Sequence, residues 1–455
     1  MVTSTVPGPE TGHRIVNRWI QLIAGIVAMM AIANLQYAWT LFTRPLTQSL
    51  NATLAAVQVA FAAFILAETW LVPFEGYLID RLGPRKVIGI GGVLVGLGWI
   101  GTGYAASLNQ LYFWYVLGGI GAGAVYGGTV GNSLKWFPDH RGLCVGFTSG
   151  AYGIGTAVTV APIAAMIKAS GYQHTLIFWG SIQGAIVVAA ALLIVAPPKG
   201  WVLPGWAEKE ALIKAKGTGP RMSALEATPA QMVRQGSFYV IYIMMTLVAF
   251  GGLVVTAQIA TIARFYKVDN IIVIGGMTAL VMAIEVDRVL NGLTRPFWGW
   301  VSDHLGRENT MFIAFAAEAL AVFGLLQLTT HPIWFILMSG LCFFAWGEIF
   351  SLFPSITADL FGKKWATTNY GIVYTSKGLA SIFAGPIAAL ASVKTGSWVQ
   401  VFYAMIICDL CAAFMALLWL RPVAARTLAR YKQIYEQEQA AEAAAARASA
   451  AKAGS

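Results

Sequence analysis

Residues 73–86 read PFEGYLIDRLGPRK, and residues 296–309 read PFWGWVSDHLGREN. The two stretches lie 223 positions apart and share Pro, Phe, Gly, Asp, Leu and Gly in register. A second, weaker pair lies 227 positions apart, between GFTSGAYGIG at 146–155 and VYTSKGLASIF at 373–383. The chain therefore consists of two similar halves. Internal repeats of this kind are typical of membrane transporters, whose substrate binds where the repeats meet.

The composition indicates a membrane protein. The chain is 58% hydrophobic and 11% charged, whereas a soluble domain is roughly 25% charged. Apolar segments long enough to cross a hydrocarbon core of about 30 Å recur along it. We place twelve of them, at 18–43, 55–77, 87–105, 111–134, 143–167, 175–196, 238–262, 272–300, 310–328, 333–357, 366–392 and 400–420. The sequence predicts an all-α membrane protein with twelve transmembrane helices in two pseudo-symmetric six-helix halves.

Breaks in the apolar pattern divide the chain into five parts. We expect a cytoplasmic N-terminus at 1–17, a first six-helix half at 18–196, and a cytoplasmic linker at 197–237 that is polar and rich in Pro and Gly. The second half follows at 238–420. The tail at 421–455 is rich in Ala, which favours a helix that lacks a core and frays into disorder.

The distribution of Lys and Arg predicts the orientation. With both termini in the cytoplasm, most of these residues fall in cytoplasmic segments, as the positive-inside rule requires. The opposite side carries Arg44, Lys168, Arg264, Lys267 and Lys394. We therefore predict a multi-pass protein of the plasma (inner) membrane. The net charge of +10 is scattered over short loops, which argues against binding to nucleic acid.

No pattern in the sequence indicates an enzyme. The five His are dispersed, and the pair Cys408 and Cys411 has neither a second Cys pair nor a nearby His to complete a metal site. The glycine-rich stretch at 118–128 lies inside an apolar segment without a flanking strand, so a nucleotide-binding loop is not expected there. We expect no enzymatic activity, no cofactor, no metal, and a monomer in the lipid bilayer.

Two cations lie inside apolar segments. Arg295 and Lys377 each cost several kcal/mol in a membrane, so such residues indicate a functional site. At the repeat offsets their counterparts are Val72 and Gly150, so the shared scaffold does not require them. The planar fork of Arg and the compact charge of Lys suit the two carboxylates of a small dianion. Two facing cations without partners repel each other when the site is empty, which favours exchange over return of an empty carrier.

Further charges leave alternatives open. Arg288 lies two turns before Arg295 on the same helix face. Glu285 precedes Arg288 by three residues, the spacing of a helical ion pair, so Arg288 either pairs with Glu285 or joins the substrate site. Glu68 and Glu348 lie in apolar segments and leave proton-coupled carboxylate symport as the alternative to exchange.

The stretch GYLIDRLGPRK, with Gly76, Asp80, Arg81, Gly83 and Arg85, resembles the loop signature of the major facilitator superfamily between its second and third spans. The copy at 299–307 resembles the degenerate second signature of that family. The resemblance implies the major facilitator fold, in which two six-helix halves alternate between outward and inward openings around one central site.

A finer resemblance, to the oxalate/formate antiporters, runs from about residue 17 to 425. The segments that carry it are NLQYAWTLF (34–42), GAVYGG (123–128), WFPDHRGL (136–143), NGLTRPFWGWVSD (291–303), AWGEIFSLFPS (345–355) and SKGLASIFAG (376–385). The resemblance implies exchange of oxalate for formate.

The same resemblance implies a set of site residues. Arg295 and Lys377 would bind the dicarboxylate. Aromatic and amide side chains would line the cavity, namely Gln36, Tyr37, Tyr126, Trp346 and Tyr374. The chain departs from the family pattern where Phe350 and Tyr374 stand at positions that tend to be Tyr and Trp. We expect the loss of a hydroxyl at Phe350 to change substrate affinity or polarity.

Overall fold

The computed structural model describes residues 17–137, 141–198, 226–362 and 365–453, together with 201, 203 and 205. This part of the chain is helical and holds no strand, only an isolated bridge between Ile272 and Thr278. The predicted all-α fold is confirmed. The predicted N-terminus at 1–17 and most of the predicted linker at 197–237 lie outside the described residues.

Two groups of helices follow each other along the chain. The first comprises α1 (Arg18–Tyr37), α2 (Trp39–Ser49), α3 (Leu54–Trp70), α4 (Val72–Leu82), α5 (Pro84–Tyr104), α6 (Leu108–Trp136), α7 (Arg141–Ile154) and α8 (Val160–Leu193). The second comprises α10 (Pro229–Met232), α11 (Gly236–Phe265), α12 (Ala279–Leu305), α13 (Arg307–Leu328), α14 (Pro332–Trp346), α15 (Ile349–Phe361), α16 (Ala366–Ile382), η1 (Phe383–Ile387), α17 (Ala388–Thr395), α18 (Val399–Met415), η2 (Ala416–Leu420) and α19 (Arg421–Ala453).

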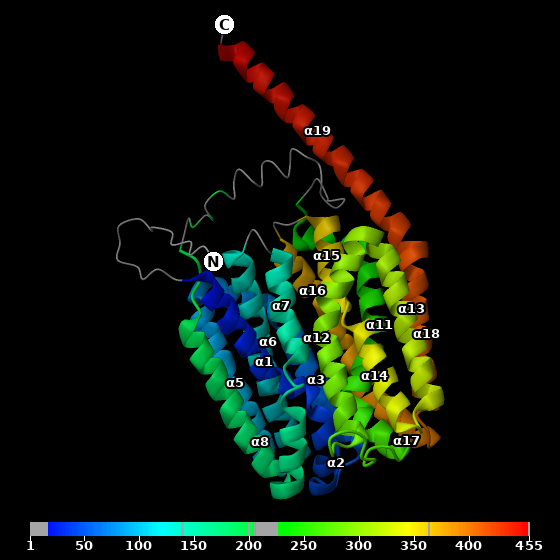
Figure 1. Cartoon of the computed structure of the whole chain (residues 1–455). Coiled ribbons are helices and arrows are strands. Elements are labelled where there is room, and N and C mark those ends of the chain that lie inside the picture. The colour runs from blue at the N-terminus through cyan, green and yellow to red at the C-terminus, as the bar shows by residue number, and fades with distance from the viewer. Residues whose placement is uncertain are drawn as a thin grey trace.

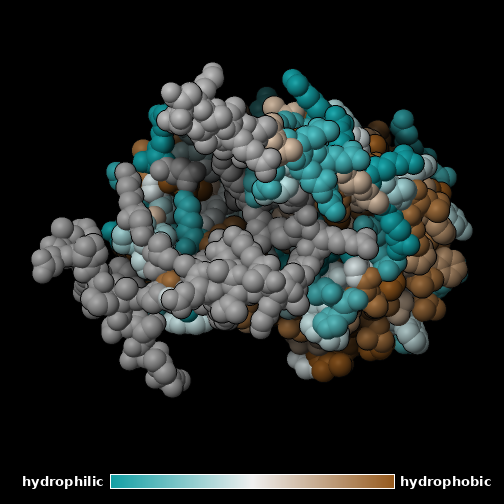
Figure 2. Space-filling view, turned by 90° about the horizontal axis from the view of Figure 1, so that it is seen from above, coloured by the Kyte–Doolittle hydropathy of each residue, from teal (hydrophilic) through white to brown (hydrophobic). Residues whose placement is uncertain are grey.

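Figure 1 shows the two groups side by side in one bundle, with α1–α8 in blue to green and the later helices in green to red. Helix α1 begins at the same end of the bundle from which α19 projects, and α2 lies at the opposite end. Figure 2, seen from the end with α19, shows hydrophilic side chains over much of that end and hydrophobic ones on the flank. The groups meet where α3 packs on α16 and η1, α7 on α12, and α2 on α11.

Not every apolar segment forms one straight helix. Eight described helices are long and apolar enough to cross a membrane, or nine if α3 and α4, which meet at a bend of 44°, count as one. The number twelve therefore stays a prediction. Helix α8 contains a break at Gly171, where φ is 80°. The predicted segment 272–300 starts too early, because a turn with Gly275 and Gly276 at positive φ precedes α12.

The repeated loop motif has the same backbone shape in both halves. Gly83 joins α4 to α5 with φ 81° and ψ 155°, and Gly306 joins α12 to α13 with φ 85° and ψ 155°. Side chains rarely adopt this φ, so glycine is required at both turns. Because these residues lie 223 positions apart, the repeat seen in the sequence is also a repeat of structure.

The other signature residues have individual contacts. The Arg85 Nε donates to the Ile194 carbonyl at 3.2 Å, and the Arg81 guanidinium lies 4.6 Å from the centre of the Tyr77 ring. A Cβ on Gly76 would meet no atom within 4 Å, so this glycine does not serve close packing in the present conformation. The side chain of Asp80 lies outside the described part of the structure.

Candidate functional site

Lys377 lies at the centre of the contact between the two helix groups. Its side chain projects from α16 and is fully buried. The ammonium Nζ donates to Glu68 Oε2 at 3.0 Å, Gln36 Oε1 at 3.0 Å and the Tyr374 hydroxyl at 3.1 Å. Tyr374 precedes Lys377 by one turn of α16, whereas Glu68 comes from α3 and Gln36 from α1. A cation of the second half is thus held mainly by acceptors of the first half.

This geometry corrects one premise drawn from the sequence. Lys377 does not lack a partner, because Glu68 forms a buried ion pair with it, with exposures of 0% and 1%. The sequence had suggested Glu68 only as a proton-coupling acid, since nothing in it indicates that residues 309 positions apart meet.

Arg295 lies on α12 and has a different kind of partner. One Nη1 hydrogen bond goes to the carbonyl oxygen of Ser149 on α7. The Nε and Nη2 atoms have no hydrogen-bond partner among the described residues, although the side chain is only 2% exposed. Burial of a guanidinium with unpaired N–H groups costs free energy. These N–H groups can donate hydrogen bonds to a bound anion.

The structure brings the two cations together over one aromatic ring. The Arg295 guanidinium carbon lies 4.4 Å from the centre of the Phe350 ring, and Lys377 Nζ lies 5.7 Å from the same centre. Phe350 comes from α15, whereas the cations come from α12 and α16. Phe350 therefore lacks a hydroxyl but still presents an aromatic face to both cations.

Tyrosine rings surround the pair. Tyr126 stacks on Tyr374 with ring centres 5.8 Å apart and planes at 12°. Tyr152 meets Tyr126 edge-on with ring centres 5.7 Å apart, and its ring is tilted against that of Tyr37 at 5.2 Å. Among the predicted site residues, Tyr37, Tyr126 and Tyr374 thus lie around the ion pair.

Trp346 lies further out. Its indole packs so closely on α11 that a Cβ on Gly252 would come within 2.2 Å of it. It meets Phe350 edge-on at 5.3 Å. Trp346 therefore contacts the ring that the cations share, and its indole Nε1 has no hydrogen-bond partner among the described residues.

Tyr152 belongs to the site although the sequence did not single it out. Its hydroxyl lies 2.9 Å from Gln36 Oε1 and 3.0 Å from Glu68 Oε1, so its one O–H proton points to the two side chains that also hold Lys377. The signal in the sequence was its place in the repeated segment 146–155. The Gln36 Nε2 atom has no partner in the described structure and remains a donor for a ligand.

Arg288 does not pair with Glu285 in this structure. Its Nη2 lies 4.0 Å from Asp287 Oδ2, and no ion pair with Glu285 occurs in the described part of the chain. The guanidinium carbon lies 4.3 Å from the Tyr37 ring centre and 4.0 Å from that of Phe343. The expected partner was wrong because Arg288 points toward the helix interface, whereas Glu285 stays partly exposed.

Hydrogen bonds join the two helix groups on either side of the buried cations. On the side of α2, Gln58 Nε2 donates to the Ala257 carbonyl at 2.9 Å and so joins α3 to α11. On the other side, Trp70 Nε1 at the end of α3 donates to the Thr375 carbonyl of α16 at 3.0 Å. Both bonds cross between the two helix groups, and the cations lie between them.

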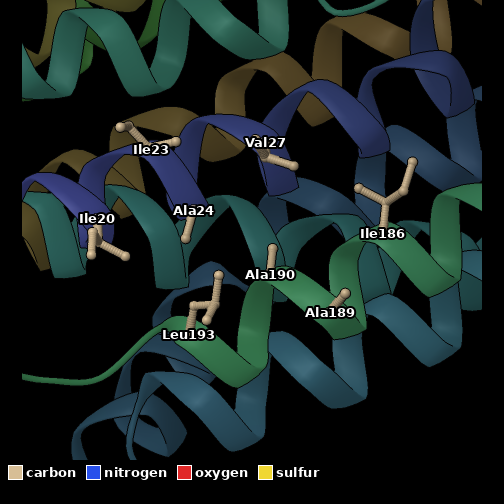
Figure 3. A pocket seen from close by; sticks show the side chains of 8 residues that line it. All are labelled: Ile20, Ile23, Ala24, Val27, Ile186, Ala189, Ala190 and Leu193. Atoms are coloured by element: carbon tan, nitrogen blue, oxygen red, sulfur yellow. The ribbon is translucent and has the colours of Figure 1, made fainter.

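An apolar groove lies outside the site and has no charged or polar lining residue. The groove lies between α1 and α8 (Figure 3). Its volume is about 330 Å³. Its lining is aliphatic, from Ile20, Ile23, Ala24, Val27, Ile186, Ala189, Ala190 and Leu193. Such a surface suits lipid chains and offers no group that could bind an anion.

Comparisons with known proteins agree with this architecture. The sequence profile of the Major Facilitator Superfamily matches residues 22–289 and 273–451. The inward-open xylose transporter of Escherichia coli superposes with a TM-score of 0.68 at 14% identity, over 89% of this chain and 96% of that one.

Relatives by sequence include a carrier of small anions. The chain is 33% identical over 395 residues to the oxalate:formate antiporter of Oxalobacter formigenes, covering 85% of this chain and 89% of the relative. It is 27% identical to an uncharacterised transporter of Escherichia coli, over 80% of this chain and 86% of the relative. Monocarboxylate transporter 12-B of Danio rerio is 21% identical, over 80% and 81%.

Proposed function

Because this chain belongs to the Major Facilitator Superfamily and, within it, to the oxalate/formate antiporter family, we propose that it exchanges small carboxylates, namely oxalate for formate. The chain is a multi-pass membrane transporter and not an enzyme. The observation that carries the proposal is the pair of buried cations, Arg295 and Lys377, over the single ring of Phe350.

A small dianion matches this arrangement. One carboxylate accepts hydrogen bonds from the unused Nε and Nη2 of Arg295, and the other lies against Lys377. The unpartnered Nε2 of Gln36 supplies a further donor. Rings of Phe350 and Tyr374 flank the cations and exclude water, which strengthens every charge contact inside.

The same contacts connect substrate binding to alternating access. Arg295 and Lys377 belong to the second half but bond to Ser149 and Glu68 of the first. The halves can rock only if these bonds break, and a bound anion stabilises the cations while they do. The repeated loops around Gly83 and Gly306 would guide the rocking motion at one end of the bundle.

We further propose that the protein is a monomer in the plasma membrane with both termini in the cytoplasm. The start of α1 and the projecting α19 lie at the same end of the bundle (Figure 1). The surplus of Lys and Arg in the segments of that side supports the orientation. The division into halves at 18–196 and 238–420 belongs to the same proposal.

Transport into proteoliposomes tests the function. We expect labelled oxalate to enter vesicles preloaded with oxalate or formate and to enter buffer-filled vesicles poorly. Arg295→Gln and Lys377→Gln should each abolish the exchange, because loss of a charge-assisted contact in a dry site costs about 2–5 kcal/mol, roughly thirty-fold or more in affinity. Near-normal exchange by either variant at equal expression would contradict the site.

Matched controls are available on the surface. Lys394→Gln and Arg426→Gln make the same substitutions at exposed positions, and both should transport normally. The alternative function, proton-coupled symport, is favoured by one observation, the acid Glu68 beside Lys377. Strong accumulation in buffer-filled vesicles under an inward proton gradient would replace exchange by symport.

A further inference from the structure

Tyr370 carries a hydroxyl that no described part of the protein binds. It lies on α16, one turn before Tyr374 and two turns before Lys377, so the three side chains share one face of the helix. The hydroxyl oxygen is buried and has no hydrogen-bond partner among the described residues. We propose that this hydroxyl binds the substrate by donating a hydrogen bond to the carboxylate that Arg295 holds. The inference rests on the proposed function and adds a residue that sets the affinity of its site.

Ring packing orients Tyr370 without the help of its hydroxyl. The ring lies 5.6 Å from that of Tyr374, centre to centre, with the planes at 36°. Tyr374 in turn stacks on Tyr126 of α6, and its hydroxyl accepts a hydrogen bond from Lys377. The position of Tyr370 is therefore fixed by its neighbours, and its hydroxyl is available to a ligand.

The groups around the hydroxyl favour an anion as its partner. The Tyr370 hydroxyl interacts electrostatically with the guanidinium of Arg295 and with the hydroxyl of Tyr126. A guanidinium has no acceptor atom, so Arg295 cannot accept a hydrogen bond from Tyr370. An anion that binds the unused Nε and Nη2 of Arg295 brings charged oxygens toward the hydroxyl. Hydrogen bonds to charged oxygens are stronger than those between neutral groups, so the substrate supplies the acceptor that the empty site lacks.

One protein group competes with the substrate for this hydroxyl. The Glu348 carboxylate, between α14 and α15, also interacts electrostatically with Tyr370 and is fully buried. Neither of its oxygens has a hydrogen-bond partner among the described residues, so Glu348 does not accept the bond in this conformation. A bond to Glu348 would serve stability, whereas a bond to the substrate serves affinity. Loss of the hydroxyl separates the two roles.

Tyr370 also offsets a hydroxyl that the adjacent helix does not provide. Phe350 of α15 presents a ring without a hydroxyl to Arg295, at 4.4 Å. Phe350 and Tyr370 both contact the ring of Tyr374, with ring centres 6.3 Å and 5.6 Å away. A single hydroxyl near the anion can therefore come from α16, as here, or from α15 if residue 350 is a tyrosine.

Calorimetry with oxalate tests this role on the purified full-length protein. Tyr370→Phe removes only the hydroxyl and should raise the dissociation constant of oxalate about tenfold, because a hydrogen bond to a charged group is lost. Its melting temperature should not fall, since the hydroxyl has no partner in the protein and its removal leaves no other group unpaired. The matched control is Tyr431→Phe on α19, where a buried hydroxyl likewise has no partner among the described residues. This control should bind oxalate as the native protein does.

A second variant returns the hydroxyl from the other helix. Phe350→Tyr/Tyr370→Phe should recover at least part of the affinity that Tyr370→Phe loses. If Tyr370→Phe lowers both affinity and melting temperature, this double variant decides: recovered oxalate affinity supports the substrate role, and no recovery overturns it.

Other outcomes would also overturn the inference. Unchanged oxalate affinity in Tyr370→Phe, with or without a lower melting temperature, would exclude the substrate role and leave the transport function standing. An equal loss of affinity in Tyr370→Phe and Tyr431→Phe would exclude it as well. If neither oxalate nor formate binds the native protein, the transport function itself fails, and the inference fails with it.

Discussion

At the scale of single residues, the charge of Arg288 is balanced by Asp287, a partner that helix spacing does not suggest. Adjacent residues on a helix do not usually face each other, yet Asp287 supplies the nearest carboxylate, at 4.0 Å, and both groups are buried. Tyr37 and Phe343 cover the guanidinium with their rings. A structural charge pair of this kind is sensitive to the loss of one member and tolerant of the loss of both.

We therefore predict that Arg288→Ala lowers the free energy of unfolding by about 3 kcal/mol, because it leaves Asp287 buried without a cation. Asp287→Ala/Arg288→Ala should recover part of this loss, whereas Glu285→Ala/Arg288→Ala should not. Thermal unfolding followed by tryptophan fluorescence in detergent compares the three. A stable Arg288→Ala protein with weakened oxalate binding would instead make Arg288 a substrate ligand.

The sequence predicted those site residues whose signal is local. Arg295 and Lys377 were evident because a cation is rare in an apolar segment. Glu68 was noticed for the same reason, but its bond to Lys377 joins α3 to α16 and depends on how the halves dock. Tyr152 was marked only by its place in the repeated segment 146–155, and a tyrosine in an apolar helix is most often a packing residue.

At the scale of helices, α7 and α12 are in backbone contact beside Arg295. A Cβ on Gly292 would lie 2.8 Å from Ile154 Cβ and 3.1 Å from the Gly150 carbonyl. Gly153 faces the Asn291 carbonyl in the same way, at 3.1 Å. The absence of side chains here allows the Arg295 guanidinium of α12 to reach the Ser149 carbonyl of α7.

Gly292→Ala should separate α7 from α12 and slow oxalate exchange at least tenfold, because a helix-to-helix contact this close cannot accept a methyl group without a backbone shift. The matched control is Gly146→Ala on α7, where a Cβ meets nothing within 4 Å. Counterflow rates at equal protein content test both. Equal rates in the two variants would show that the carrier does not need this contact.

The positions at which helices break could not be predicted from the sequence. The apolar pattern predicts continuous segments at 18–43 and 333–357, but α1 ends at Tyr37 and α14 at Trp346. Neither break coincides with a proline. At the second break, a Cβ on Gly347 would lie 2.1 Å from Thr294 Cγ2, so the break follows from the close approach of α12. Such tertiary causes leave no periodic signal in the sequence.

At the scale of the whole molecule, the pseudo-symmetry was predictable because the motif at 73–86 recurs at 296–309. The paired turns at Gly83 and Gly306 confirm it in the backbone. The hydrogen bonds between the two helix groups were not predictable, since Gln58 and Ala257 join across 199 positions. Their bond and that of Trp70 to Thr375 depend on one particular arrangement of the two halves.

The charges of the buried site have an electrical consequence for the whole carrier. Arg295, Lys377 and Glu68 belong to the protein, so their charges return with it in every cycle of exchange. Oxalate carries two negative charges and formate carries one. Exchange of one oxalate for one formate therefore moves one net negative charge across the membrane.

An imposed voltage should accordingly change the rate of oxalate–formate exchange, because one elementary charge moved through about 100 mV is worth about 2.3 kcal/mol. An inside-positive potassium diffusion potential should accelerate oxalate uptake, and an inside-negative one should slow it. Exchange of oxalate for oxalate moves no net charge and should respond to neither. Equal rates of oxalate–formate exchange at the two potentials would contradict this. A carrier with these fixed charges would thus generate a current each time it exchanges the two anions.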